Sequence, residues 1–278
     1  MKKISRRSFL AAAAVSVAAL AMTACGGSAS SAASSVASSA ASSEAASSAA
    51  VADLTTVEAG KLTMATNATF PPYEMTTDAG TIEGIDVDTA KAIAEKLGLE
   101  LQIDDMDFDA ALLSVQQGKA DIVMAGVTVT DERKAVMDFS DSYATGIQSI
   151  IVPNDSDIAS PDDLAGKKIG TQRGTTGYIY CSDDFGEDSV VAYDNGLTAV
   201  QALNNGQVDA VVIDNAPATE YVAANPGLKV LDTSYAEEDY AIGMAKGSAL
   251  EDAINKALEE LKADGTLQAI VDKYINAN

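Results

Sequence analysis

The chain has 278 residues, of which 47% are hydrophobic and 21% are charged, enough for one large or two modest domains with a buried core. Its 18 Lys and Arg residues against 41 Asp and Glu residues give a formal charge of -23, which argues against nucleic acid or an anionic membrane surface as a partner. The absence of histidine excludes histidine general bases, histidine metal ligands and Ser-His-Asp triads.

Residues 1–24 predict an export signal, because a basic start precedes an apolar run too short for a permanent membrane span. The run ends in Met22-Thr23-Ala24-Cys25, which resembles the lipobox of bacterial lipoproteins and implies a lipidated Cys25. Two or more acyl chains there would anchor the mature protein to the cell membrane. Residues 5–10 also look like a twin-arginine motif, so both export routes stay open, as does an ordinary signal with an incidental cysteine.

Residues 25–57 are expected to form a tether behind this anchor. From Gly26 to Ala52 the chain is almost entirely Ser, Ala and Gly, with too few large apolar groups to fold. As a flexible coil this stretch would span about 30 Å.

Beyond residue 58, short apolar runs alternate with amphipathic helical segments, which is typical of an α/β domain. Strands are expected at 61–66, 100–103, 121–126, 148–153, 168–173, 209–214 and 240–245. Helices are expected at 86–97, 109–117, 197–204, 249–263 and 267–275, with stops at Gly98, Gly118 and Gly206.

Two parts of this pattern are similar. A strand, a helix and the segment GKAD (118–121) are echoed later by a strand, a helix and GQVD (206–209). We interpret them as two α/β lobes of related topology, with a site between them.

The second cysteine, Cys181, is interpreted as a small packing residue.

Asp105, Asp107 and Asp109 alternate as at the start of a calcium loop. Ala110 replaces the glycine that such a loop needs, and Gln116 replaces its bidentate glutamate. The run is therefore interpreted as a solvated, helix-capping turn, and neither a metal nor a cofactor is expected.

The glycine-rich stretch GTQRGTTG (170–177) follows an expected strand and opens a helix, so its N–H groups could face an anion. It lacks the Gly-Lys-Ser/Thr ending of a phosphate loop. A plain strand-to-helix turn and a ligand loop both stay open.

Arg133 stands where helix electrostatics argues against a cation. Thr130 is expected to be the N-cap of a helix over 131–133, so the arginine would lie at the positive end of the dipole. One interpretation is an exposed arginine neutralised by the two acids before it. The other is a buried anion site, in which Gly126 gives a ligand access to the backbone, Thr128 offers N–H and hydroxyl donors, and Arg133 pairs with a carboxylate.

Asp214 ends the apolar run DAVVID, at the carboxyl end of a strand where α/β folds commonly bind ligands. An N-cap for a helix running through Ala218 explains it equally well.

Several long segments, taken in order, resemble family 3 of the extracellular solute-binding proteins, which deliver polar amino acids to ATP-binding-cassette (ABC) importers. These segments are 65–75, 84–98, 106–113, 118–143, 209–218, 240–247 and 263–275. The resemblance implies an α/β, two-lobed periplasmic-binding-protein-like fold (type II) that closes over one amino acid. It implies a first lobe of 58–144 and 243–278, a second lobe of 148–239, and two crossover hinge strands at 145–147 and 240–242.

The same resemblance implies roles for residues at both ends of the ligand. Arg133, with Gly126 and Thr128, would hold the α-carboxylate, and Asp214 would hold the α-ammonium.

Phe70 and Phe108 match the aromatic positions that sandwich the ligand's aliphatic part, and Thr176 with Gln172 matches the second-lobe loop. Asn67 stands where many members have an aspartate, and Gln172 where some have a basic residue. A neutral polar ligand such as glutamine fits this change, since a buried cationic head needs a partner.

Three other acids, Glu74, Glu83 and Asp107, remain alternatives as partners for a cationic ligand. The expected protein is therefore a monomeric, lipid-anchored, extracytoplasmic receptor that passes a free amino acid to an ABC permease and is not an enzyme. Two alternatives stay open: a sensor for a signalling protein, and a dehydratase with Asp214 or Glu74 as general acid or base, for which the sequence offers no convincing proton-transfer pair.

Overall fold

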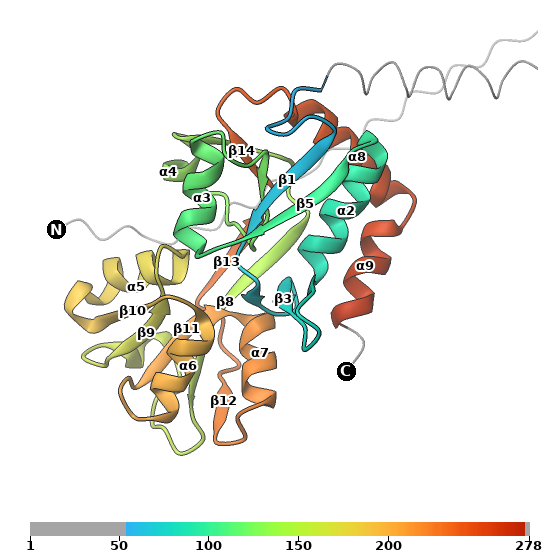
Figure 1. Cartoon of the computed structure of the whole chain (residues 1–278). Coiled ribbons are helices and arrows are strands. Elements are labelled where there is room, and N and C mark those ends of the chain that lie inside the picture. The colour runs from blue at the N-terminus through green and yellow to red at the C-terminus, as the bar shows by residue number, and fades with distance from the viewer. Residues whose placement is uncertain (1–53, 276–278) are drawn as a thin grey trace, which may run out of the picture. The chain divides into compact units, whose positions relative to one another are not determined.

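The computed structural model describes residues 54–275, and the expected signal peptide, Cys25, most of the tether and residues 276–278 lie outside them. The described residues build two large sheets, each with its own helices (Figure 1). None of the helices within 54–275 has the length and apolar character that crossing a membrane requires.

The first lobe is built on a mixed sheet with the strand order β5-β1-β6-β14-β7, in which β5, β1 and β6 are parallel. Its strands are β1 (Lys61–Thr66), β5 (Glu100–Asp105), β6 (Ile122–Val123), β7 (Met137–Phe139) and β14 (Gly243–Ala245). A small sheet beside it contains β2 (Thr69–Phe70), β3 (Glu74–Thr76) and β4 (Ile82–Glu83).

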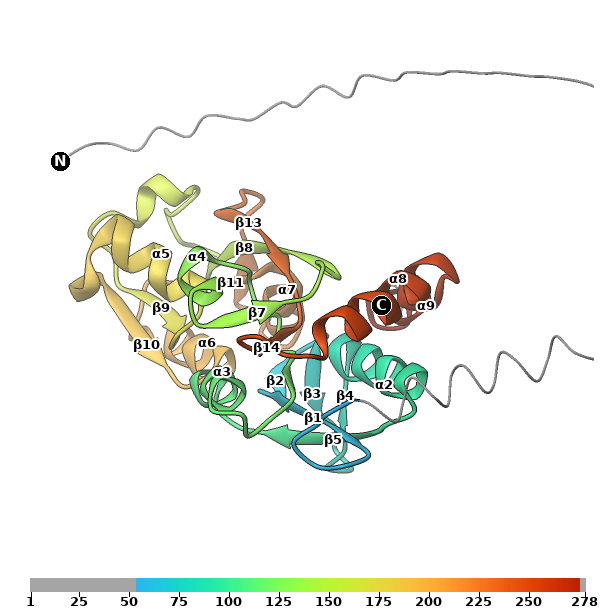
Figure 2. The same ribbon diagram turned by 90° about the horizontal axis from the view of Figure 1, so that it is seen from above.

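Helices cover both faces of this first sheet. Three helices pack against one another on one side, as Figures 1 and 2 show: α2 (Ile85–Leu97), α8 (Glu251–Ala263) and α9 (Thr266–Ile275). The helix α3 (Phe108–Gln116) packs with Ala65 in a separate apolar cluster, and the single turn α4 (Asp131–Lys134) precedes β7. The expected stop of α2 is confirmed, because Gly98 adopts a left-handed conformation with φ 67°.

The second lobe is built on a sheet with the order β10-β9-β11-β8-β12, and β13 also pairs with β8. Its strands are β8 (Ala144–Pro153), β9 (Ile169–Gln172), β10 (Val190–Tyr193), β11 (Ala210–Asp214), β12 (Leu228–Val230) and β13 (Ala236–Tyr240). Its helices are α5 (Thr176–Phe185), α6 (Gly196–Asn204) and α7 (Asn215–Ala223), with short 3₁₀ turns at Pro161–Leu164 and Glu187–Ser189.

Successive side chains of β11 point to opposite faces of the sheet, so the core of this lobe consists of two apolar clusters. Val211 and Ile213 pack in one cluster with residues of α6 and α7, whereas Val212 packs in another with Cys181 of α5. Cys181 is fully buried, so its interpretation as a packing residue is confirmed.

The two Gly-x-x-Asp segments, 118–121 and 206–209, make the same kind of contact in the two lobes. Asp121 accepts hydrogen bonds from the backbone N–H groups of Thr63 at 2.8 Å and Val57 at 2.7 Å, and Asp209 accepts one from Lys168 N at 2.8 Å. Each aspartate thus ties the strand that follows it to the beginning of the neighbouring parallel strand. The matching orders β5-β1-β6 and β10-β9-β11 confirm two lobes of related topology.

Two antiparallel strands, β8 and β13, run between the lobes (Figure 1), with Ala144 opposite Tyr240 and Gln148 opposite Ala236. The expected single strand over 240–245 is wrong. β13 ends at Tyr240, and β14 begins at Gly243 in the other sheet, because the chain changes sheets at residues 241–242.

Replacing Asp121 by Asn is expected to lower the free energy of unfolding by about 2 kcal/mol, because two charge-assisted hydrogen bonds to backbone N–H groups are lost. Urea unfolding of the purified protein measures this. The control is Asp78→Asn, at an exposed turn residue, for which we expect a change within about 0.5 kcal/mol. Equal stability of the two variants would contradict the strand-tying role.

Candidate functional site

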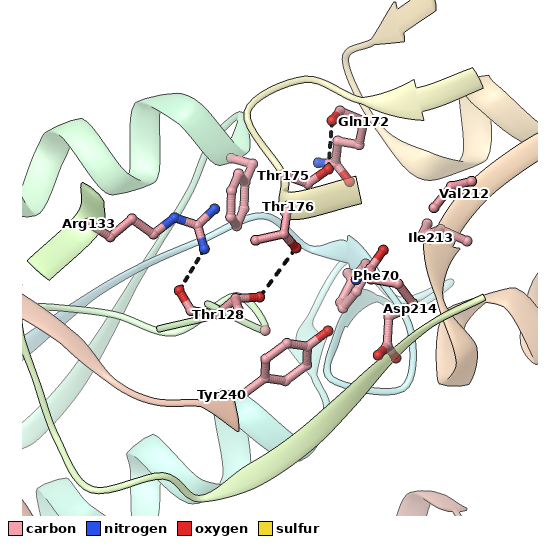
Figure 3. A pocket seen from close by; sticks show the side chains of 13 residues that line it. Phe70, Thr128, Arg133, Gln172, Thr175, Thr176, Val212, Ile213, Asp214 and Tyr240 are labelled. Carbon is pink, nitrogen blue, oxygen red and sulfur yellow. Dashed lines mark hydrogen bonds between the residues drawn. The ribbon is translucent and has the colours of Figure 1, made fainter. Parts of the chain in front are cut away.

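A pocket with about 330 Å³ of empty space, counted to its mouth, lies between the two lobes. Of the nine expected binding residues, eight line it, namely Phe70, Phe108, Gly126, Thr128, Arg133, Gln172, Thr176 and Asp214 (Figure 3). Asn67 does not line the pocket and lies behind Gln172, to which it is hydrogen-bonded.

Arg133 is buried, with 9% of its surface exposed, and two backbone carbonyls hold its guanidinium. Nη1 donates to Thr128 O at 2.8 Å, and Nη2 donates to Gly174 O at 3.1 Å from the other lobe. The guanidinium carbon lies 5.4 Å from the centre of the Phe108 ring. A guanidinium carries five N–H donors, so three of them remain free of protein acceptors among the described residues.

The interpretation of Arg133 as an exposed residue neutralised by its acidic neighbours is wrong. Asp131 and Glu132 are exposed, and no carboxylate of residues 54–275 lies within ion-pair distance of the guanidinium. Thr130 is the N-cap, as expected, and accepts from Arg133 N at 3.2 Å. The positive charge of Arg133 is only weakly opposed by the helix dipole of α4, because α4 is a single turn. Burial lowers the pKa of Arg133, and the Glu238 carboxylate is the main charge opposing this.

Three backbone N–H groups at or next to residues of the pocket lining have no acceptor among residues 54–275. The N–H of Thr128 has no acceptor among the described residues, although Val127 and Val129 on either side of it both bond to the chain around Tyr240. The N–H groups of Thr176 and Gly177, at the start of α5, also have no acceptor within 54–275. The stretch GTQRGTTG is therefore both a strand-to-helix turn, capped by Thr175, and part of the pocket wall.

Asp214 ends β11 on the other side of the pocket and is 2% exposed. Its Oδ1 accepts from Ala216 N at 3.0 Å, so it is the N-cap of α7, and its Oδ2 accepts from Ile147 N at 2.7 Å. Burial raises the pKa of Asp214 to about 6, although these two N–H groups and the Tyr240 hydroxyl act to lower it. Both interpretations made from the sequence are thus compatible with one carboxylate.

Aromatic rings occupy the space that Gly126 leaves open. A Cβ on Gly126, which has φ +55°, would lie 2.8 Å from Phe70 Cε1 and 3.2 Å from Tyr240 Cε2. Its N–H donates to Asp86 Oδ2 at 3.0 Å and is not available to a ligand. A glycine is required here for ring packing and a left-handed turn, and the expectation that a ligand approaches the rest of its backbone stays a prediction, since Gly126 lines the pocket.

Besides the bonds that involve the connecting strands β8 and β13, four hydrogen bonds cross between the lobes. Gln172 Nε2 donates to Asn67 Oδ1 at 3.0 Å, Tyr221 Oη donates to Thr69 O at 2.5 Å, and the hydroxyls of Thr128 and Thr176 lie 3.4 Å apart. The fourth is the bond from Arg133 to Gly174 O.

Gly174 has no room for a side chain in this closed arrangement. With φ +74°, a Cβ placed on it would overlap Oδ1 of Asp109, which belongs to α3 of the other lobe. The lobes therefore meet over a bare backbone segment at this point.

Comparison with known families matches residues 62–277 to the bacterial extracellular solute-binding proteins, family 3. The chain belongs to this family. It is a solute-binding protein and not an enzyme, as expected, and its α/β, two-lobed periplasmic-binding-protein fold is confirmed.

Individual relatives agree with this membership. The protein is 34% identical to a probable histidine-binding protein of Neisseria gonorrhoeae, covering 95% of this chain and 94% of that one. It is 33% identical to the L-cystine-binding protein TcyJ of Escherichia coli (strain K12), covering 80% and 85%. Among solved structures, an ancestral arginine-binding protein bound to arginine is 45% identical, with a TM-score of 0.74 and coverage of 78% and 98%.

Two further acids of this solute-binding protein are buried behind the pocket. Asp86 accepts from Gly126 N and, at 2.7 Å, from the Tyr143 hydroxyl, and burial raises its pKa to about 6. Glu74 is fully buried beside it, and burial followed by the Asp86 charge raises the pKa of Glu74 well above its ordinary value. Glu74 does not line the pocket, so it is not the inward-pointing partner for a ligand cation considered above.

The acidic run before α3 only partly follows expectation. Asp107 is at the N-cap position but makes no side-chain cap, and Asp105 instead accepts from Ala68 N at 2.8 Å. Among the described residues, no group of three or more Cys, Asp or Glu side chains is arranged to hold a metal ion.

Sequence reasoning missed four polar residues at the site. Tyr240, Gln148 and Thr175 line the pocket, and Glu238 lies behind it and bonds to Gln148. Tyr240 and Gln148 are the first residues of two strands expected from the sequence, and this position was the signal that could have identified them. Glu238 lies in the run EED, and its burial became visible only through the pairing of β13 with β8.

Carbon-detected NMR titration is expected to find the Asp214 carboxyl changing charge near pH 6, above the ordinary aspartate value, because burial disfavours its ionised form. Tyr240→Phe should raise this pKa further, since the hydroxyl bond that lowers it is lost. Asp214→Asn identifies the resonance and separates it from that of Asp86. A resonance lost in Asp214→Asn that titrates at the ordinary value would contradict the burial.

Proposed function

We propose that the protein captures one free polar L-amino acid by closing its lobes over it and delivers the amino acid to the permease of an ABC importer. The observation that carries the proposal is that a buried cation from the first lobe, Arg133, and a buried carboxylate from the second, Asp214, line one pocket. Opposite charges at two ends of a small cavity match the two charged groups of a zwitterion. The names of the relatives, which include binding proteins for histidine, cystine and arginine, support the same class of ligand.

The α-carboxylate would bind Arg133 and the free backbone donors beside it. The guanidinium is already held flat by two carbonyls, so it loses little freedom when it adds an anion. The N–H of Thr128 and those of the first turn of α5, which have no acceptor among the described residues, would donate to the same carboxylate from the two lobes. The α-ammonium would pair with Asp214 and favour its ionised form.

The ligand's side chain would lie between the rings of Phe70 and Phe108 and extend toward Gln172. Gln172 donates its amide to Asn67, and its carbonyl oxygen has no donor among the described residues. Since Asn67 and Gln172 are both neutral, we propose a neutral polar amino acid such as glutamine. The structure solved for an ancestral arginine-binding protein bound to glutamine, 43% identical with a TM-score of 0.73 and coverage of 78% and 99%, supports including this ligand beside arginine.

In this proposal, most of the binding free energy comes from contacts that form only when the lobes enclose the ligand. An amino acid has about ten heavy atoms, and at roughly 0.8 kcal/mol for each the limit is near -8 kcal/mol, or about micromolar affinity. Such efficiency requires nearly complete enclosure. We place the hinge at residues 145–147 and 240–242, where the strands between the lobes pass, and a ligand bridging Arg133 and Asp214 would favour the closed state that the permease recognises.

The lipid anchor belongs to the same proposal. The lipobox resemblance ending at Cys25 and the Ser/Ala-rich tether after it support a monomer held on the outer side of the cell membrane, free to reach a permease. Metabolic labelling with a fatty acid analogue tests this, and loss of the label in Cys25→Ser is the expected result.

Calorimetry of the protein against the twenty common amino acids and cystine should find at least one ligand of about micromolar affinity or better. The absence of any such ligand would contradict the proposed function. If arginine binds more tightly than glutamine, the neutral side-chain preference is wrong while the function stands. Co-purification with a permease separates an importer component from a sensor.

Arg133→Ala is expected to weaken binding of that ligand by about 3 to 5 kcal/mol, because it leaves a buried carboxylate unpaired. Arg173→Ala is the matched control, since Arg173 follows Gln172 of the pocket lining but is itself exposed, does not line the pocket and pairs loosely with Asp194 at 3.8 Å. Thermal unfolding of both variants monitors the fold. Wild-type affinity in Arg133→Ala would contradict the proposed role of Arg133 in binding the α-carboxylate of the ligand.

A further inference from the structure

Glu238 is a buried carboxylate with an unusual set of neighbours. It lies in β13, one of the two strands between the lobes, where Glu237 and Asp239 on either side are exposed while Glu238 is 6% exposed. No Lys or Arg of the described residues forms an ion pair with it, and its Oε1 is buried without a hydrogen-bond partner within 54–275. A buried carboxylate is costly unless something depends on it.

The side-chain hydrogen bonds from Glu238 to residues of the pocket lining use a single oxygen. Its Oε2 accepts from Thr128 Oγ1 at 3.0 Å and from Gln148 Nε2 at 3.0 Å. Thr128 and Gln148 both line the pocket, whereas Glu238 does not. An effect of Glu238 on a ligand through hydrogen bonds to the pocket lining therefore passes through one of these two side chains, whereas its charge also acts on Arg133 and Asp214.

The bond to Thr128 determines what its hydroxyl can do. A threonine hydroxyl has one proton and two lone pairs, and this proton is donated to Glu238. Toward the pocket, where Thr176 Oγ1 lies 3.4 Å away (Figure 3), the Thr128 oxygen can therefore only accept. This corrects the expectation that the Thr128 hydroxyl donates to the ligand carboxylate; its N–H keeps that ability.

We propose that Glu238 is a positioning residue for amino-acid recognition: by taking the only hydroxyl proton of Thr128, it makes this hydroxyl an obligatory acceptor for the ligand's α-ammonium. The proposal rests on the proposed function. It gives the ammonium an acceptor from the first lobe in addition to Asp214 from the second. A ligand without the amino group then leaves the Thr128 oxygen with only the Thr176 hydroxyl, 3.4 Å away, as a donor.

The test compares each amino acid with its des-amino analogue, using L-glutamine with glutaramic acid and L-arginine with 5-guanidinopentanoic acid. The measured quantity is the preference, defined as the ratio of the two dissociation constants obtained by competition. Glu238→Met removes the carboxylate that accepts the Thr128 hydroxyl proton. It should lower the preference about tenfold, which is the effect of one hydrogen bond to a charged group. Glu238→Gln keeps an acceptor oxygen at the same place and should stay within about twofold of wild type.

Thr128→Val and the double variant show whether the effect passes through the hydroxyl. Thr128→Val should lower the preference by the same factor as Glu238→Met, and the double variant should lower it no further. Glu237→Met, on the exposed side of the same strand, is the matched control and should keep the wild-type preference. A merely structural role for Glu238 would weaken the amino acid and its analogue equally.

The results that overturn the proposal are a wild-type preference in either Thr128→Val or Glu238→Met, or additive losses in the double variant, which would mean that Glu238 acts by its charge alone. If Glu238→Met does not fold, a wild-type preference in Thr128→Val still overturns the proposal. Failure of the wild-type protein to bind any of the four compounds or any other amino acid would instead contradict the proposed function.

Discussion

The site depends on how the Arg133 guanidinium is held. A buried cation needs compensation, and here it comes from carbonyl oxygens of Thr128 and Gly174 and from the face of Phe108, with no carboxylate at ion-pair distance among the described residues. Because carbonyl dipoles neutralise only part of a full charge, the guanidinium retains both charge and N–H donors for an anion. Since the two carbonyls belong to different lobes, the same bonds also tie Arg133 to the closed arrangement.

The negative groups of the site are held in the same indirect way. Asp214 is bonded to backbone N–H groups of Ile147 and Ala216, Asp86 to that of Gly126, and Glu238 to side chains of the wall. Each charge is thus fixed by the strand or turn beside it and is not consumed by a protein cation. A zwitterion placed between Arg133 and Asp214 would join the two lobes through its own charges, which links recognition to closure.

Much of the fold follows from local pattern, whereas the fine geometry of the site does not. The strand at 61–66 and the helices at 86–97 and 249–263 have clear periodicity and glycine or polar ends, and the structure has them within two residues. The expected binding residues lie together because the resemblance covers their segments. The strand β13 was missed, since its acids read as an exposed loop and its pairing with β8 joins residues about ninety positions apart. The burial of Glu238 and the direction of the Thr128 hydroxyl depend on that pairing and could not be seen from the sequence.

A crystal structure of the protein with its tightest amino acid bound tests the central claim most directly. We expect the α-carboxylate within hydrogen-bond distance of the Arg133 guanidinium and the α-ammonium within hydrogen-bond distance of Asp214, with the solute enclosed between Phe70 and Phe108. A bound amino acid whose two charged groups contact neither residue would contradict the account.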